Sequence, residues 1–116
     1  MKIYKDLKND ELVIYTKEVQ LGEKYKLLVP RSTDAAVEKH VPIVKEENGM
    51  VYVTVGEIPH PMIEEHYISH IIMETDIGYY VRLLKPGDEP KTIFKLNDNE
   101  EIVNVYAYCN LHGLWR

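Results

Sequence analysis

The chain has 116 residues, the length of one domain with a single hydrophobic core, and its 45% apolar and 28% charged residues are typical of a globular protein. The formal net charge of −5 argues against a nucleic-acid partner, because phosphate binding requires a basic face. No apolar run approaches the roughly 20 residues that a membrane-spanning helix needs, so no membrane partner is expected.

The sequence predicts a cytoplasmic location. Lysine and aspartate recur through residues 1–13, so this segment does not resemble a signal peptide. Cys109 is the only cysteine, and a single cysteine cannot form an intramolecular disulfide. Both features agree with a reducing compartment.

Short β-rich runs predict an all-β fold. In chain order, strands are expected at residues 11–15, 41–44, 50–55, 66–73, 79–84, 92–96 and 102–108. Asn48-Gly49 is a strong hairpin signal, since both residues tolerate positive φ. Residues 75–78, 85–88 and 97–99 mark further turns, and residues 32–37 form the one expected helical turn, opened by Ser/Thr/Asp capping residues. About seven or eight short strands at this spacing predict a β-sandwich.

The last expected strand predicts where the cysteine points. Successive side chains of a strand alternate between its faces, so Cys109 should share one face with three apolar residues: Val103, Val105 and Ala107. This apolar row indicates the inner surface of the sandwich. The turn that follows would fold His112 back over the sulfur.

Cys109 and the histidines form a candidate metal clamp. Cys109 precedes His112 by three residues, so one tight turn can aim a thiolate and an imidazole at the same point. Residues 38–42 and 60–67 supply the other nitrogen donors. Taken singly, each histidine reads as a surface or hydrogen-bonded residue and the cysteine as a small buried hydrophobe. The joint layout favours one redox-active iron near the surface.

Four motifs carry a resemblance to a known family: EKHVP at 38–42, HPM with EHYI at 60–68, LKPGD at 84–88 and CNLHGLW at 109–115. In this order and at these spacings they resemble the superoxide reductase family, which comprises the neelaredoxins and the iron domain of the desulfoferrodoxins. The resemblance implies an immunoglobulin-like β-sandwich as the iron domain over residues 25–116. Residues 1–24 form an N-terminal extension without cysteines, interpreted as one or two extra strands or a relic of a desulforedoxin-like domain.

The resemblance also implies a ligand set for one mononuclear iron, with Cys109 as axial thiolate and four equatorial nitrogens from His40, His60, His66 and His112. Such a set leaves one octahedral position for substrate, whereas zinc has no accessible redox step and prefers four ligands. The implied activity is the one-electron reduction of superoxide to hydrogen peroxide. A rubredoxin-type protein is the implied electron donor, and the sequence leaves open a homo-oligomer such as a dimer or tetramer.

Glu38 and Lys39 directly precede His40 and are the candidate catalytic residues. Lys39 would draw in superoxide by its charge, and the resemblance implies that Glu38 can occupy the sixth position of the resting ferric iron. The alternative is a solvated charge pair on a loop. His70 lies where the family usually carries a large aromatic residue; on a strand it would sit roughly 13 Å from His66, so we expect it to be structural.

Two other functions stay open on the sequence alone. One is a β-sandwich that keeps its metal only as a structural staple, since a bound ion stabilises the native state. A redox-inert metal, or the lack of an open coordination position, would favour it. The other is an iron-binding electron-transfer module, which predicts a fully ligated iron that binds no small anion when reduced.

Overall fold

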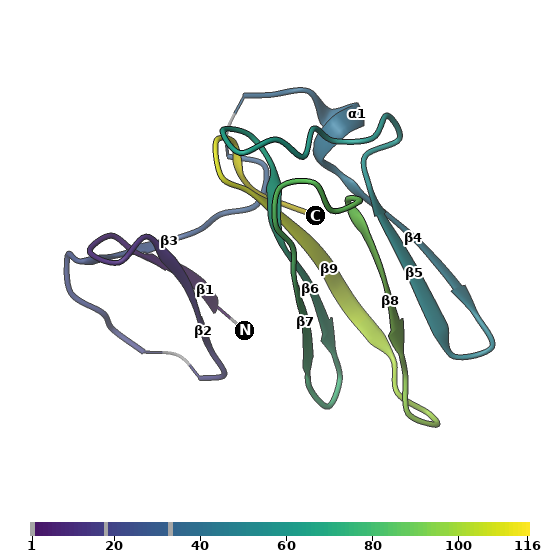
Figure 1. The fold of residues 1–116 in the computed structure, drawn as a ribbon. Coiled ribbons are helices and arrows are strands. Elements are labelled where there is room, and N and C mark those ends of the chain that lie inside the picture. The colour runs from purple at the N-terminus through teal and green to yellow at the C-terminus, as the bar shows by residue number, and fades with distance from the viewer. Residues whose placement is uncertain (1, 18, 33) are drawn as a thin grey trace.

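The computed structural model describes residues 2–17, 19–32 and 34–116, which form three antiparallel sheets (Figure 1). Their order in space is β2-β1-β3, β10-β9-β6-β7 and β4-β5-β8. The strands are β1 Lys2–Asp6, β2 Glu11–Tyr15, β3 Tyr25–Leu27, β4 Pro42–Glu47, β5 Met50–Val55, β6 Ile68–Thr75, β7 Tyr79–Leu83, β8 Lys91–Lys95, β9 Ile102–Cys109 and β10 Gly113–Trp115.

The predicted β-sandwich consists of the four-stranded sheet packed on the β4-β5-β8 sheet, seven strands in all. Strand β5 shows why these residues form a half-buried strand: Val51, Val53 and Val55 point inward and are at most 1% exposed, while Tyr52 and Thr54 point outward. Burying one such side chain contributes roughly 1.5–3 kcal/mol. The connection from β8 to β9 crosses between the two sheets, because β8 pairs with β5 and β9 pairs with β6.

The N-terminal sheet covers the other face of the four-stranded sheet. Ile3 of β1 packs in one buried cluster with Ile72, Tyr106, Tyr108 and Leu114. The molecule therefore has three layers, visible from left to right in Figure 1. The N-terminal sheet includes β3, so it extends across the expected boundary between residues 24 and 25. Residues 1 and 18 of the expected extension lie outside the described residues.

Two bulges change which side chains face the core. Ile68 pairs with Cys109 but His70 pairs with Tyr108, so Ser69 is an extra residue on β6. At the other end of the β6–β9 ladder, Val103 is the extra residue on β9 and is 53% exposed. The expectation that Val103 faces inward is therefore wrong, because the bulge shifts the alternation by one residue. The same expectation is confirmed for Val105, Ala107 and Cys109, which belong to the sandwich core.

The expected helical turn over residues 32–37 is wrong in position, and Thr33 lies outside the described residues. The helix α1 spans Val37–His40, after an extended Ala36 that makes no side-chain cap bond. Tertiary bonds fix its place, because Ile58 N donates to Glu38 O at 2.9 Å. With four residues, α1 is the one helix in the described part of the chain, and no helix found there is long and apolar enough to cross a membrane.

Candidate metal centre

Three segments meet at one end of the sandwich, drawn at the top of Figure 1. Helix α1 ends in His40, and the loop between β5 and β6 carries His60 and His66. The end of β9 carries Cys109, and the turn before β10 carries His112. The expected strand over residues 66–73 begins only at Ile68, which leaves His66 in a tight turn bridged to Ile63. The fold thus brings together residues that are up to 72 positions apart.

The four histidine rings form a closed square. Neighbouring ring centroids lie 4.6 Å apart for His40–His60 and His60–His66, 5.0 Å for His66–His112 and 4.9 Å for His112–His40. Neighbouring rings are nearly perpendicular, at 75° to 84°. The diagonal pair His40–His66 is 6.2 Å apart and tilted by only 31°. This is the arrangement of imidazoles around a common centre.

Main-chain carbonyls fix the tautomers of two rings. His40 Nδ1 donates to Ala36 O and His60 Nδ1 donates to Pro61 O, both at 2.7 Å, since a carbonyl oxygen can only accept. In each neutral ring Nε2 therefore carries a lone pair. These two Nε2 atoms lie 3.1 Å apart, too close for facing lone pairs without a cation between them. Two metal–imidazole bonds of about 2.1 Å at a right angle would place their nitrogens about 3 Å apart, which fits this spacing.

The donor atoms of His112 and Cys109 contact one another and the first ring: His112 Nδ1 lies 3.1 Å from His40 Nε2 and 3.9 Å from Cys109 Sγ. His66 Nε2 is buried and has no hydrogen-bond partner among the described residues. Potential ligand atoms of His40, His66, Cys109 and His112 all lie within 4.8 Å of one another. His60 falls outside that tight group but reaches it through His40 Nε2. One sulfur and several imidazole nitrogens form a donor set that suits iron, copper or zinc.

Burial sets the protonation of these groups. Desolvation lowers the pKa of His40 and His66, and lowers the pKa of His60 to about 4. These rings are therefore neutral at pH 7, the form that binds a metal. Burial raises the pKa of the Cys109 thiol, and the backbone N–H groups of His112 and Leu111 oppose that rise. A coordinated metal would remove the thiol proton.

Glu38 and Lys39 lie on α1 beside the ring square. Glu38 is exposed and Lys39 is half-buried. The charge of Lys39 contributes to the lowered pKa of both His40 and His66, although burial is the larger cause. The ammonium of Lys39 therefore acts electrostatically on the site, and Glu38 acts on His40 in the opposite direction.

Two further aromatic side chains, His70 and Trp115, lie outside the group of candidate metal ligands. His70 is outside the metal group: its Nδ1 lies 2.7 Å from Ser69 Oγ and its ring contacts Tyr108 beneath the N-terminal sheet. The Ser69 bulge turns it away from the core. Trp115, which the sequence did not single out as a site residue, stacks on His40 at 4.8 Å and donates from Nε1 to His112 O at 3.0 Å.

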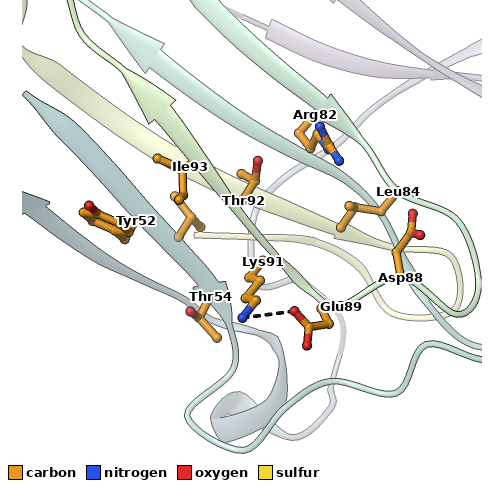
Figure 2. Close-up of a pocket in the computed structure, with 10 residues that line it drawn as sticks. Tyr52, Thr54, Arg82, Leu84, Asp88, Glu89, Lys91, Thr92 and Ile93 are labelled. Carbon is orange, nitrogen blue, oxygen red and sulfur yellow. Dashed lines mark ion pairs between the residues drawn. The ribbon is translucent and has the colours of Figure 1, made fainter.

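One large pocket is separate from the metal group. Figure 2 shows it at the open edge between β7 and β8, with a volume of about 680 Å³. Its polar residues include Arg82, Asp88, Glu89 and Lys91, and Glu89 and Lys91 form an ion pair at 3.0 Å. None of the histidines or Cys109 lines it. This pocket therefore includes none of the candidate metal ligands.

The fold and the site define a small β-sandwich protein with a cluster of histidines and one cysteine that could hold a metal ion. A family model described as Desulfoferrodoxin matches residues 32–116, and the chain belongs to the desulfoferrodoxin family. A desulfoferrodoxin homolog of Archaeoglobus fulgidus is 45% identical over 95 residues, covering 82% of this chain and 74% of that protein. The superoxide reductase of Pyrococcus horikoshii is 36% identical over 103 residues, covering 73% and 89%.

Two solved structures are similar to this chain, one of them over almost its whole length. The superoxide reductase from Treponema pallidum superposes with a TM-score of 0.80 at 30% identity and covers 99% of this chain and 98% of its own. The superoxide reductase from Giardia intestinalis has a TM-score of 0.55 at 35% identity, covering 67% of this chain and 93% of its own. The first of these similarities includes the N-terminal sheet, whereas the family match begins only at residue 32.

Proposed function

We propose that this protein is a superoxide reductase whose single iron is held by Cys109 and the four histidines of the ring square. The observation that carries the proposal is the approach of two unprotonated Nε2 atoms, from His40 and His60, to 3.1 Å. The names of the relatives from Pyrococcus and Treponema support the same assignment. In this assignment Nε2 binds from His40, His60 and His66, and Nδ1 binds from His112, because these atoms point inward.

The reaction adds one electron and two protons to superoxide and gives hydrogen peroxide. Iron bound at this centre would supply the one-electron redox step, which zinc cannot perform. The chain's own residues hold the geometry: Ala36 O and Pro61 O orient two rings, and burial keeps the rings neutral. Cys109 would hold the metal as a soft thiolate ligand and would add electron density to it.

Lys39 and Glu38 are the proposed catalytic pair. The positive charge of Lys39 contributes to the lowered pKa of His40 and His66. The same charge would attract the superoxide anion to a protein that is acidic as a whole. Glu38 is exposed on the same helical turn and is proposed as the carboxylate that reaches the ferric centre after turnover.

The electron is proposed to come from a separate rubredoxin-type protein, since one cysteine cannot hold a second iron centre of the desulforedoxin kind. A cytoplasmic location and a dimeric or tetrameric state remain predictions from the sequence. The interpretation of residues 1–24 as a relic of a cysteine-containing domain also remains a prediction.

Metal analysis combined with an absorption spectrum tests the ligand set. The protein is loaded anaerobically with ferrous iron, desalted and oxidised. We expect one iron per chain and a thiolate-to-ferric charge-transfer band that is absent from Cys109→Ser. Failure to retain iron, or a ferric spectrum without that band, would contradict the proposal. A reduced site whose spectrum does not respond to added azide would favour the electron-carrier alternative.

A further inference from the structure

Asn110 connects the two halves of the metal centre. It lies between Cys109 and His112, yet the three hydrogen bonds found for it in the described part of the chain go to the residues on either side of His66. Its side-chain oxygen accepts from Tyr67 N at 2.9 Å, and its side-chain amide donates to Glu65 O at 3.0 Å. Its main-chain N–H donates to Tyr67 O at 3.2 Å.

His66 needs such a connection more than its neighbours do. The rings of His40 and His60 are each oriented by a bond from Nδ1 to a carbonyl, whereas no ring hydrogen bond of His66 is found in the described part of the chain. The direction of its ring therefore depends on where its main chain is held. That main chain is fixed by the two-way bridge to Ile63 and by the bonds from Asn110.

We propose that Asn110 is a positioning residue that locks His66 to the Cys109–His112 turn, so that the sulfur and three ring nitrogens keep one relative geometry. The inference rests on the proposed iron site and deepens it. Asn110 touches neither the substrate nor the donor atoms. It acts through the main chain of Glu65 and Tyr67.

The chemistry of the side chain makes the proposal specific. The amide of Asn110 offers an acceptor to Tyr67 N and a donor to Glu65 O from two different atoms, whereas a carboxylate offers acceptors alone. Asn110→Asp keeps the acceptor but sets a carboxylate oxygen against the carbonyl of Glu65. If the amide pairing matters, this nearly isosteric change should be as damaging as Asn110→Ala. If Asn110 only fills space, Asn110→Asp should behave like the wild type.

The test measures the affinity of the full chain for ferrous iron by competition with a chelator. The signal is the fluorescence of Trp115, the only tryptophan, which stacks on His40. Asn110→Ala and Asn110→Asp should each weaken binding by about 10- to 100-fold, the usual effect of removing a group that orients a ligand. The matched control is Asn97→Ala. Its side-chain amide donates to Glu100 at 3.2 Å near the opposite end of β9, so it should leave the affinity unchanged.

A double-mutant cycle with His66→Ala separates positioning from general destabilisation. In the His66→Ala background, Asn110→Ala should weaken binding further by no more than about threefold, because the ring it positions is gone. An equal penalty in both backgrounds would overturn the inference. A second result would overturn the inference and leave the proposed iron site standing. In that result the wild type binds iron and shows the charge-transfer band, and both Asn110 variants bind iron as tightly as the wild type. A wild type that binds no iron would overturn the proposed function and this inference together.

Discussion

Gly56→Ala should damage the fold and the metal centre together, because Gly56 lies where two ligand-bearing segments cross. Gly56 has φ +89°, and an added Cβ would clash with Ile58 O and lie 2.6 Å from Lys39 O. Its N–H donates to Val41 O at 3.1 Å. Glycine is therefore what lets α1, which ends in His40, approach the loop that carries His60.

The magnitude follows from the geometry. A left-handed φ costs an alanine about 1–2 kcal/mol, and the overpacking adds about 1–3 kcal/mol. Ordinary Cβ contacts begin near 3.4 Å, so relief of the 2.6 Å contact with Lys39 O requires the two segments to separate by about 0.8 Å. That shift would widen the 3.1 Å spacing of the His40 and His60 nitrogens. We expect a loss of roughly 2–5 kcal/mol in unfolding free energy and about 10- to 100-fold weaker iron binding.

Gly87→Ala is the matched control. Gly87 has φ +92° but nothing within 4 Å of an added Cβ, so it isolates the backbone strain from the clash. Urea unfolding of the metal-free proteins and iron competition would be measured for both variants. If Gly56→Ala loses no more stability than Gly87→Ala and binds iron as tightly, the close crossing does not set the His40–His60 spacing.

Three further predictions concern the site. Cys109→Ser should abolish superoxide reduction even where iron remains, because a serine oxygen replaces a thiolate poorly; near-normal turnover by the loaded variant would refute this. Lys39→Ala should slow the second-order reaction with superoxide, and most at low ionic strength, because it removes an attracting charge. The control Lys95→Ala should leave that rate unchanged, and Glu38→Ala should chiefly alter the ferric spectrum. Pulse radiolysis at two salt concentrations would check all three variants. The unfolding free energy of the metal-free protein should fall as pH drops from about 6.5 towards 4. The reason is that burial lowers the pKa of His60 to about 4, so the unfolded chain binds more protons than the folded one in this range. An unfolding free energy that does not change across that range would contradict the prediction.

Local signals in the sequence predicted most of the sandwich. Asn48 and Gly49 take φ values of 52° and 79° in the β4–β5 hairpin, as the dipeptide indicated. The alternation of β5 and the inward direction of Cys109 were also readable from the sequence. These features depend on a few neighbouring residues, so a single sequence is sufficient to predict them.

Features that depend on a partner strand were not predictable. The bulges at Ser69 and Val103 exist only relative to the pairing of β6 with β9. Strands β3 and β10 have three residues each, too short for a periodic signal, and β1 was expected only as one of the one or two extra strands within residues 1–24, without bounds. The helix α1 is fixed by bonds to a distant loop rather than by its own capping residues, which explains its displacement from the expected turn.

The site shows the same division. Motif spacing singled out Cys109 and four of the five histidines, and the structure brings these five residues together at one end of the sandwich. Which ring nitrogens point inward depends on the carbonyls of Ala36 and Pro61, whose directions only the folded backbone defines. The hydrogen bonds of the Asn110 side chain to Tyr67 and Glu65 join residues 43 and 45 positions apart, so no short sequence pattern could predict them.

The stoichiometry of turnover tests the central claim most directly. The iron-loaded protein is given superoxide in the presence of rubredoxin and its reductase, and reductant, peroxide and oxygen are measured together. Superoxide reduction predicts one electron consumed and one hydrogen peroxide formed for each superoxide, with no oxygen released. Oxygen evolution equal to peroxide formation, without consumption of reductant, would show dismutation and contradict the account.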